Sequence, residues 1–455
     1  MNFFRSQLLR FLAPVVLLVL GAVVCAVLLP AEQASVLNQF FGFPDSDVAT
    51  HQMRPWVVQG LCFLPALAGF LYAIGGTMDR YIARQFGGIF GVCLSALLSI
   101  WLLMDLADKV SDFRESAEVF QTIRDFYTTL APTVLLLLLP YSLLLALLYS
   151  LGKLSGSREI IAMIQAGRSV FRITLPLLLA GIMFSLLCLG LNYHWAPTAE
   201  AKADQILTAS SGDTPLDATN VLYRNAIDRR LWEIGEFPHD YQIGKPLKNV
   251  EVTTTRSDRT LESRLFATEA LWNRGDQSWT FRNPVIEEFT PDGAPVFRKL
   301  GPSLSISNWS ETPWQLIKPG LSASELGIPD LTTWLKANAA GGRFAVASPY
   351  QTQWHYRWAL PFTCLVTVLL ATPLGIHFSR RGTGGGVFLA VALSALMLLL
   401  GSVSLALGES GILTPALAAW LPNLTFSLIG FYLFYRRISG RPIYRVLRQF
   451  VPGNF

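Results

Sequence analysis

Residues 265–286 read LFATEALWNRGDQSWTFRNPVI. Apolar and polar side chains alternate on both sides of Asn273–Gln277, a run with the Asn, Gly and Asp composition of a hairpin connection. The same period of two recurs in Leu231–Ile234 and Asn249–Thr253, which indicates further short strands. Many short strands separated by turn residues are typical of an antiparallel sandwich or jellyroll. We therefore predict a β-domain within the polar block 196–350, followed by a short helix that starts at Ile328.

The polar block lies between two groups of apolar segments that are long enough to cross a membrane. A bilayer core requires about 20 apolar residues per helix. The eight candidate spans are Phe11–Pro30, Pro55–Met78, Gln85–Met104, Phe126–Gly152, Ile173–Tyr193, Trp358–Ser379, Gly382–Gly408 and Ser410–Tyr435. The hydrophobic fraction of 52%, the charged fraction of 15% and the mean hydropathy of +0.41 agree with this pattern. The chain is therefore predicted to be an integral membrane protein that carries its own aqueous domain.

The basic residues predict the orientation, because short loops rich in Lys and Arg stay in the cytoplasm. The loops and termini on one side contain Arg5, Arg10, Arg80, Arg84, Lys153, Arg158, Arg168, Arg172, Arg380, Arg381, Arg436, Arg437, Arg441, Arg445 and Arg448. The short loops on the other side contain only Arg54, Lys109, Arg114 and Arg124. Both termini are therefore predicted to be cytoplasmic and the β-domain to lie outside. The net charge of +5 reflects this distribution and does not indicate a nucleic-acid partner.

The sequence offers no catalytic or metal-binding constellation. All five cysteines fall within apolar spans, so no disulfide framework, zinc site or other metal site is predicted in the outer domain. His239 lies beside Asp240, but no nucleophile motif accompanies them, and a solvated turn is the simpler interpretation. The chain has no Gly-x-x-x-x-Gly-Lys-Ser/Thr phosphate loop and no predicted cofactor. If transport requires ATP, another subunit must bind it.

The loop between the fourth and fifth spans, residues 157–167, predicts a short amphipathic helix. Ser157 is a candidate N-cap, Glu159 falls in the first turn, where the helix dipole favours an anion, and Gly167 suits the C-cap. Ile160, Met163, Ile164 and Gly167 share one stripe at helical spacing. Two interpretations follow from the pattern alone: a connector that rests in the lipid headgroups, or a coupling helix seated in the groove of a partner, with Glu159 paired to a basic residue there.

Four stretches together resemble the LptF/LptG family, the permease subunits of the lipopolysaccharide export ABC transporter. They are Met78–Ile82, Leu139–Leu143 followed by Leu151–Gly167, Arg343–Pro361, and Leu421–Asn423. The resemblance covers about residues 78–440, and it depends on the order of the motifs and on the position of the polar insert between three spans and three more. Residues 1–77 add two spans to the six of the family.

The resemblance implies a fold, a location and a set of partners. The fold is an α-helical integral membrane protein with a periplasmic antiparallel β-jellyroll domain between the third and fourth family spans. Its parts are an N-terminal extension (1–77), a first span triplet (78–195), the β-domain (196–350), a second triplet (351–440) and a cytoplasmic basic tail (441–455). The location is the bacterial inner membrane. The partners are a cytoplasmic ABC ATPase dimer, a second LptF/LptG-type permease, periplasmic jellyroll bridge proteins, lipopolysaccharide and membrane lipids.

The resemblance also suggests two groups of site residues. The ATPase dimer of that family grips the coupling helix, which here comprises Ser157, Arg158, Glu159, Ile160, Met163, Gln165, Ala166 and Gly167. A lipid path is expected along the outer ends of the third, fifth and sixth spans, near Trp101, Met104, Asp105, Lys109, Leu191, His194, Tyr356 and Trp358. This region departs from the family, whose first span often has basic residues at its outer end, whereas Asp105 and Asp108 stand here. Asp105 is expected to pair with a partner permease or with Lys109, four residues further along the helix.

The resemblance predicts a non-catalytic permease that extracts lipopolysaccharide from the inner membrane and passes it to a jellyroll bridge toward the outer membrane. Two alternatives are a permease of another lipid or lipoprotein exporter, and a membrane scaffold with a β-sandwich ectodomain. The coupling helix distinguishes these hypotheses, because a scaffold has no use for Glu159.

Overall fold

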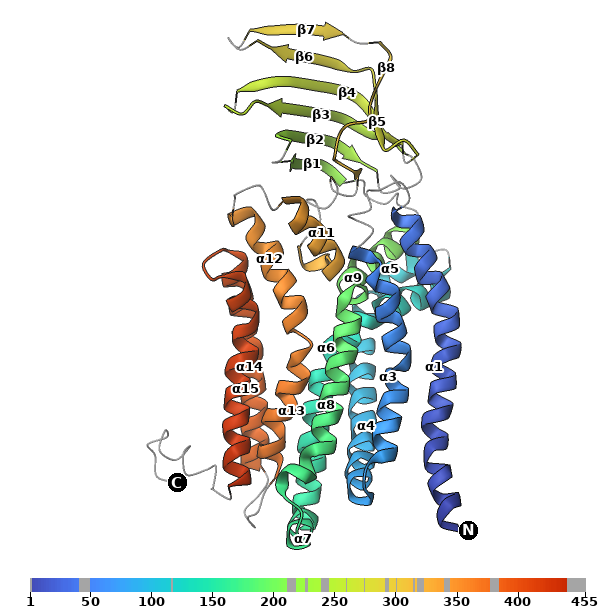
Figure 1. Cartoon of the computed structure of the whole chain (residues 1–455), viewed down its shortest axis with the longest axis vertical. Helices are drawn as coiled ribbons and strands as arrows, with labels where there is room; N and C mark the ends of the chain where they lie inside the picture. The colour runs from blue at the N-terminus through green and yellow to red at the C-terminus, as the bar shows by residue number, and fades with distance from the viewer. Residues whose placement is uncertain are drawn as a thin grey trace.

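The computed structural model describes residues 2–40, 50–115, 118–210, 218–225, 228–238, 245–258, 260–273, 275–290, 294–299, 301–313, 316, 323–338, 344–376 and 384–439. It consists of a bundle of long helices with a β-sheet stacked on one end, while the short helix α7 (Glu159–Gln165) lies at the opposite end (Figure 1). These ends are called the β-domain end and the α7 end below.

The long helices reproduce seven of the predicted spans. They are α1 (Asn2–Phe40), α3 (Met53–Ile74), α4 (Thr77–Asp108), α6 (Val119–Gly156), α8 (Val170–Tyr193), α14 (Gly384–Glu409) and α15 (Pro415–Ile438). In the described part of the chain, these seven helices are long and apolar enough to cross a membrane, and an eighth span results if a bent pair of helices is counted as one. The shorter helical elements are α5 (Val110–Glu115), α9 (Trp195–Ser210), η3 (Ala323–Glu325) and α11 (Ile328–Asn338).

The prediction of one continuous helix for the sixth span, Trp358–Ser379, was wrong. The structure has two helices, α12 (Phe344–Ala359) and α13 (Phe362–Gly375), which bend by 50° at Leu360 and Pro361. Proline lacks the amide hydrogen that continues a helix, and its ring crowds the carbonyl four residues earlier. Pro361 therefore permits a break here, although the apolar run continues through it.

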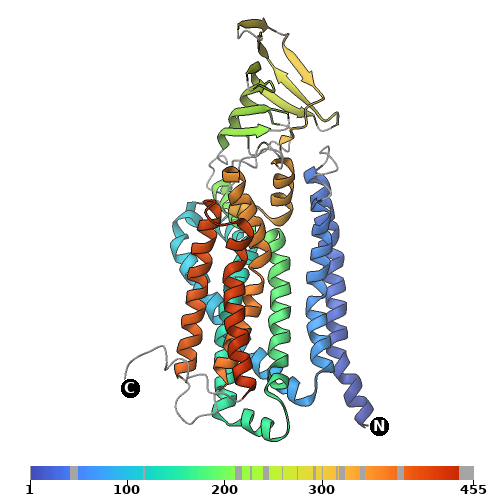
Figure 2. The same ribbon diagram turned by 60° about the vertical axis from the view of Figure 1, so that its left-hand side comes forward.

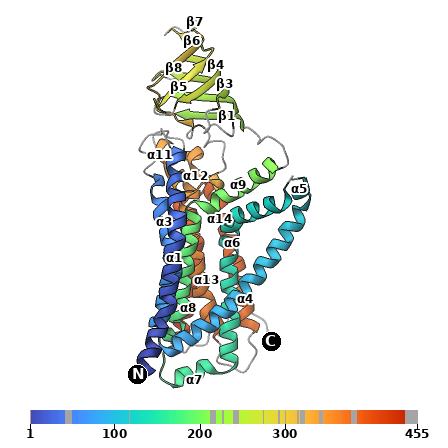
Figure 3. The ribbon, with the colours of Figure 1, turned by 90° about the vertical axis from the view of Figure 1, so that its right-hand side faces the viewer.

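The core of the bundle is built around α6 and α13. Eleven residues of α13, from Cys364 and Val366 through Gly375, are buried among α6, α8 and α15. The buried residues of α4 (Ile82, Phe86 and Phe90) all lie in its first half, and none of its described residues beyond Phe90 is buried. Figure 3 shows this second half leaning away from the bundle toward α5 and α9.

The N-terminal extension forms a helical hairpin that packs on α8. Gly21 of α1 allows close approach to α3, because a Cβ there would lie 2.6 Å from Cys62 O. Gly190 of α8 allows α8 and α3 to approach closely, because a Cβ there would lie 2.4 Å from Leu61 Cδ2. Figure 2 shows α1 and α3 as a layer at one side of the remaining helices. The two added helices are thus bound to the family spans by close packing.

The β-domain is one antiparallel sheet of eight strands. They are β1 (Ala218–Asn225), β2 (Arg230–Phe237), β3 (Leu247–Thr255), β4 (Leu261–Asn273), β5 (Ser278–Arg282), β6 (Val285–Phe289), β7 (Pro295–Lys299) and β8 (Ser303–Ile306). The predicted hairpin is confirmed, since Asn273 pairs with Ser278 and Trp272 with Trp279. β1 lies nearest to the helices and β7 furthest from them (Figure 1). The strands occupy only the middle of the block 196–350, because α9 fills its start and α11 and α12 fill its end.

The sheet forks at Asn283 and Pro284. β5 and β6 both pair with β4, and they keep one register, from Asn273↔Ser278 to Ser263↔Glu288. On their other edges β5 pairs with β8, whereas β6 pairs with β7. Asn283 has a φ of 49° and its amide donates to Pro302 O at 2.9 Å, so the backbone turns out of the ladder there. The sequence predicted Ser278–Ile286 as one strand, which is correct in register but misses this branch point.

One face of the sheet is apolar from strand to strand. Tyr223, Trp232, Val252, Leu265 and Ile286 lie opposite one another across β1, β2, β3, β4 and β6. The first four are buried, and Ile286 is half-buried. Leu304 and Ile306 on β8 are also half-buried. The apolar face is thus closed near the bundle and partly open toward the far edge of the sheet.

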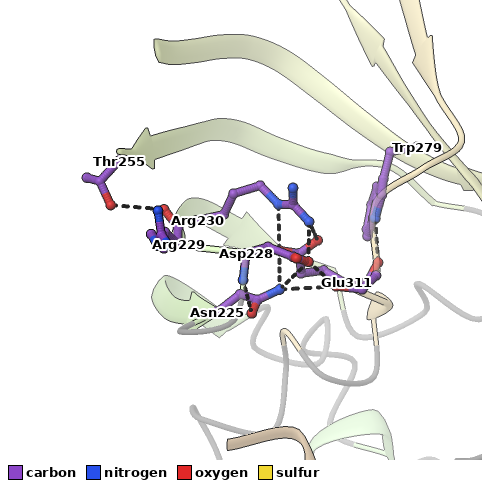
Figure 4. A network of polar contacts seen from close by, with 8 residues as sticks. Asn225, Asp228, Arg229, Arg230, Thr255, Trp279 and Glu311 are labelled. Atoms are coloured by element: carbon purple, nitrogen blue, oxygen red, sulfur yellow. Dashed lines mark hydrogen bonds and ion pairs between the residues drawn. The ribbon is translucent and has the colours of Figure 1, made fainter. Parts of the chain in front are cut away.

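A cluster of hydrogen-bonded polar side chains, called the polar clasp below, lies at the end of this face near the bundle and consists of Asn225, Arg230, Trp279 and Glu311 (Figure 4). The Arg230 guanidinium donates to both carboxylate oxygens of Glu311, at 2.8 and 2.9 Å, and Glu311 is fully buried. Asn225 Nδ2 donates to Glu311 Oε1 at 2.8 Å, and Trp279 Nε1 donates to Glu311 O at 2.7 Å. A bidentate arginine–carboxylate pair fixes both distance and direction. The clasp therefore holds the segment after β8 against the β1–β2 hairpin.

Candidate functional site

The α7 helix is shorter than predicted and has clear ends. Arg158, with a φ of 59°, is the residue before its first turn, so the prediction of Ser157 as the N-cap was wrong by one residue. The Ser157 hydroxyl instead donates to Glu159 Oε1 at 2.9 Å. The predicted C-cap, Gly167, is also one residue off, because the C-cap is Ala166 and Gly167 follows it as the left-handed residue that terminates the helix. Gly167 has a φ of 85°, its amide donates to Ile164 O, and the Arg168 amide donates to Met163 O, which is a Schellman motif.

The apolar stripe of α7 faces the bundle. Ile160 is fully buried and Met163 is 7% exposed, and both belong to the main core cluster of the helices. The opposite side of the helix is exposed at Ser157, Arg158, Ala162, Gln165 and Ala166. Ile160 and Met163 therefore position the helix, and only the remaining predicted residues are free to contact a partner.

Two polar bonds hold α7 and the residues after it against the first turns of α4. The Tyr81 hydroxyl donates to Glu159 Oε2 at 2.8 Å, and Arg168 Nη1 donates to Asp79 Oδ1 at 2.7 Å. Two of the stretches that carry the family resemblance, Met78–Ile82 and Leu151–Gly167, thus meet in space. Sequence reasoning did not identify Tyr81 or Asp79 as partners of this loop, because they lie 78 and 89 residues from Glu159 and Arg168.

A chamber of about 320 Å³ lies within the bundle between α6, the α12–α13 break, α14 and α15. Its apolar lining includes Leu136, Leu137, Leu144, Leu360, Met397, Leu398 and Leu405. Its polar lining comprises Thr133, Tyr141, Tyr356, Thr363, Thr367, Ser394, Ser402 and Asn423. A mostly apolar concavity with a few polar groups is the usual form of a site for a lipid or other apolar ligand.

Of the predicted lipid-path residues, all of which are described, Tyr356 alone lines this chamber. Trp101, Met104 and Asp105 lie on the outlying half of α4, where Met104 is 65% exposed. Leu191 lies near the β-domain end of α8, whereas Trp358 lies in the last turn of α12 beside the break, and neither residue lines the chamber. The structure therefore does not bring the predicted path together as one site.

Asp105, near the end of α4, is bonded within the chain. The expected Asp105–Lys109 pair is present, with Lys109 Nζ 3.8 Å from Asp105 Oδ1. The Tyr127 hydroxyl donates to Asp105 Oδ2 at 3.0 Å, and Lys109 Nζ lies 4.3 Å from the centre of the Phe126 ring. Asp105 and Lys109 thus join α4 to α6.

His194 belongs to a buried polar cluster instead of a lipid path. It is 4% exposed, and its Nδ1 lies 3.8 Å from Asp330 Oδ2, while His51 Nε2 lies 2.9 Å from Asp330 Oδ1. Arg54, beside these groups, is paired with Glu32 at 2.5 Å. Burial, together with the positive charge of Arg54, holds the pKa of His194 well below its ordinary value. His194 is therefore neutral at pH 7 and connects α8 to α11.

The boundaries of the family match lie near the ends of helices in the structure. A family model described as lipopolysaccharide export system permease LptF/LptG matches residues 80–436, from the first turn of α4 to the last turn of α15. The chain belongs to the LptF/LptG permease family. A comparison with curated proteins found no match.

Membership of the LptF/LptG family states the general role of the chain. It is a multi-pass inner-membrane subunit of the lipopolysaccharide export system, and it is a transporter subunit, not a catalytic enzyme. The helices α4 to α15 and the β-sheet between them make up the family permease, whereas α1 and α3 precede the matched residues.

Proposed function

We propose that this LptF/LptG permease extracts lipopolysaccharide from the inner membrane, driven by a cytoplasmic ATPase dimer that grips α7, and passes it to periplasmic jellyroll bridge proteins. The observation that carries the proposal is the form of α7. Its apolar side is anchored in the core, its polar side is exposed, and Glu159 is held in place by Tyr81 and Ser157. A helix that is fixed to the bundle on one side and exposed on the other is suited to receive force from a partner.

The proposal places the α7 end in the cytoplasm and the β-domain in the periplasm. Basic residues concentrate at the α7 end, where Arg80, Arg84, Lys153, Arg158, Arg168, Arg172, Arg436 and Arg437 lie. At the β-domain end, Arg54 pairs with Glu32, Lys109 with Asp105 and Arg124 with Asp125. The excess of Lys and Arg at the α7 end supports the orientation, because short loops rich in these residues stay on the cytoplasmic side.

The energetics of lipid extraction explain why a partner ATPase is needed. Exposing an acyl chain to water costs about 0.8 kcal/mol per methylene, so a chain of a dozen carbons costs on the order of 10 kcal/mol. The chamber beside α6 and α14 would keep one such chain away from water. The half-open apolar row on the sheet, which ends at Ile286, would receive it next.

A second permease is proposed to cover the open side of the bundle. The half of α4 beyond Phe90 has no buried residue among those described. The α14 helix, on the chamber wall, exposes Phe388, Leu396 and Leu399 to between 53% and 76%. Lipid and a second permease can share these surfaces, which would enclose a lipopolysaccharide molecule between two subunits.

Co-purification tests the partner assignment. The wild-type permease is expected to bring down an ATPase and a second LptF/LptG-type permease from detergent-solubilised membranes. Glu159→Lys should abolish recovery of the ATPase, because it reverses the charge in the first turn of α7. Glu118→Lys makes the same charge change near the β-domain end and serves as the matched control. A wild-type permease that purifies without any nucleotide-binding protein, or equal recovery with Glu159→Lys, would contradict the proposal.

A further inference from the structure

The break between α12 and α13 lies beside the chamber and removes helical partners from two backbone carbonyls. Pro361 has no amide hydrogen, so the Arg357 carbonyl four residues earlier loses its donor. The Thr363 amide, which would bond to Ala359 O in an unbroken helix, donates to Leu360 O at 3.0 Å. Inside a membrane no water is present to satisfy such carbonyls, so they require donors from elsewhere in the protein.

Two asparagine side chains from other helices supply these donors. Asn192 Nδ2, on α8, donates to Arg357 O at 2.7 Å. Asn423 Nδ2, on α15, donates to Ala359 O at 2.6 Å. Asn192 is fully buried and Asn423 is 7% exposed. Asn192 Oδ1 also accepts from Arg357 Nη1 at 3.2 Å, so the same amide binds the backbone and the side chain of Arg357. The break is therefore held from two sides.

The helix on the outer side of the break is bonded to the base of the β-domain. The Arg357 guanidinium donates to the Ser324 carbonyl of η3. Trp354 Nε1 donates to Thr332 Oγ1 of α11 at 3.0 Å, and the ring of Tyr350 stacks on Trp334 at 3.7 Å. η3 and α11 are the elements through which the chain returns from the sheet. Any rotation of α12 therefore moves the support of the β-domain.

The helix on the inner side of the break is bonded to the α7 end. Arg437 of α15 donates to Pro373 O at 3.0 and 2.9 Å and thereby caps the end of α13. Gly375 brings α13 against α6, because a Cβ there would lie 2.9 Å from Leu151 Cβ. Leu151 lies in the last turns of α6, directly before α7. Any displacement of α7 therefore reaches α13.

We propose that the α12–α13 break is a hinge of the transport cycle and that Asn192 and Asn423 are positioning residues that set its angle. Force on α7 would shift α13 and change the bend. The change would move Tyr356, Leu360 and Thr363 on the chamber wall and, through α12, the base of the β-domain. The source of the force rests on the proposed function, whereas the hinge itself can be tested in the permease alone. Hinges of this kind are a few element-terminal residues that absorb a conformational change.

Hydrogen exchange in the purified permease tests the hinge directly. Asn192→Leu and Asn423→Leu remove the donors and keep the side-chain size, so the amides of residue 360 and of residues 362–364 should exchange about tenfold faster in each variant. Thr372→Val is the matched control, because it removes a buried hydroxyl of α13 that bonds to Val368 O of the same helix. Unchanged exchange of the amides of residues 360 and 362–364 would overturn the proposal. So would an equal increase throughout the bundle, since it would indicate general loss of packing.

Pro361→Ala separates the role of Asn192 at the carbonyl from simple packing. This substitution provides an amide for Arg357 O, so Asn192→Leu should have a smaller effect on exchange in the Pro361→Ala background than in the wild type. Equal effects in the two backgrounds would show that Asn192 does not act through the carbonyl that Pro361 leaves unpaired.

Transport measurements test the role of the hinge in the cycle. In the reconstituted complex, Asn192→Leu, which lies outside the chamber lining, should retain ATP hydrolysis within about twofold and lose about tenfold in lipid released per ATP. Unchanged release per ATP would overturn the hinge as a transport element. If the wild-type complex hydrolyses no ATP, the proposed function fails, whereas the exchange experiment still decides whether the break is a hinge.

Discussion

At the scale of single residues, Glu159, the proposed contact to the ATPase, is held in one orientation by its own chain. Its two carboxylate oxygens accept from Tyr81 at 2.8 Å and from Ser157 at 2.9 Å. A charged side chain that is already oriented loses less conformational freedom when a partner binds it. The bond to Tyr81 also links α7 to α4, so that displacement of α7 acts on two family spans at once.

Tyr81→Phe is expected to weaken coupling without abolishing it. The substitution removes one hydrogen bond to Glu159, worth about 1 kcal/mol, but leaves the charge that a partner would contact. ATPase activity stimulated by the permease should fall by roughly fivefold, compared with complete loss in Glu159→Lys. The measurement is ATP hydrolysis in the reconstituted complex. A loss as complete as that of Glu159→Lys would show that Tyr81 has a different role, and unchanged hydrolysis would show that the bond does not matter.

His194 predicts a dependence of stability on pH. Its pKa is well below 6.5 in the folded protein because of burial and Arg54, and returns to about 6.5 in the unfolded chain. Below pH 6.5 the unfolded state therefore binds the additional proton. Stability from this group is fully present above pH 6.5 and falls by about 1.4 kcal/mol for each unit below it, until the folded pKa is reached.

The pH effect can be measured by thermal unfolding between pH 8 and pH 5. The wild type should lose more stability over this range than His194→Gln, which has no titrating group at this position. Equal losses in the two proteins would contradict the account of His194.

At the scale of elements, α11 is the piece that joins the N-terminal hairpin, α8 and the β-domain. Asp330, 2% exposed, accepts from His51 in the segment before α3, and Thr333 Oγ1 lies 2.8 Å from Thr50 Oγ1. Gly327 allows the start of α11 to approach α8, because a Cβ there would lie 2.9 Å from Tyr193 O. The extension therefore holds the base of the β-domain as well as the side of the bundle.

Asp330→Leu is expected to destabilise this junction by about 3 kcal/mol. The substitution removes the buried carboxylate that faces His51 and His194 and leaves their ring nitrogens without this polar neighbour. Thermal unfolding and the exchange of α11 amides measure the effect. Glu325→Gln, in the neighbouring η3, is the control. Burial and the nearby carboxylates of Glu200 and Asp204 raise the pKa of Glu325, so its neutralisation should not destabilise the protein. Equal unfolding temperatures for Asp330→Leu and the wild type would contradict this role.

Elements that depend on a few neighbouring residues were predicted from the sequence, whereas the α12–α13 break, which depends on residues far away in the chain, was not. The β4–β5 hairpin, α11 and the Gly167 end of α7 each follow from a few neighbouring residues. The break at Pro361 does not, because prolines are also present inside spans that stay continuous, such as Pro132 and Pro140 in α6. The donors that stabilise the break are 165 and 64 residues from the carbonyls they bind.

At the scale of the whole molecule, the sequence predicted the order of the parts but not the lateral position of the candidate lipid site. The predicted path grouped residues by their depth in the membrane, at the outer ends of three spans. The structure separates them, because the second half of α4 leaves the bundle and the end of α8 is covered by α3 and α11. The chamber instead combines four helical walls, whose packing no local pattern shows.

The whole molecule links an exposed helix at one end to an apolar sheet face at the other. The connection runs from α7 through the ends of α6 and α13, across the bend at Pro361, and through α12 and α11 to the base of the sheet. The half-buried Ile286 lies where the apolar face opens. Phe266, 36% exposed, points to the opposite face of the same sheet, since it follows Leu265 on β4.

The most direct test of the account is photocrosslinking of lipopolysaccharide to the β-domain in proteoliposomes that contain the complete exporter. A photoreactive residue at Ile286 should crosslink lipopolysaccharide only when ATP is added, and Glu159→Lys in the same chain should abolish the signal. The photoreactive residue at Phe266 should stay uncrosslinked throughout. Two results would contradict ATP-driven transfer of lipopolysaccharide to the apolar face of the sheet. One is a signal at Ile286 that is the same with and without ATP, and the other is a signal at Phe266 equal to that at Ile286.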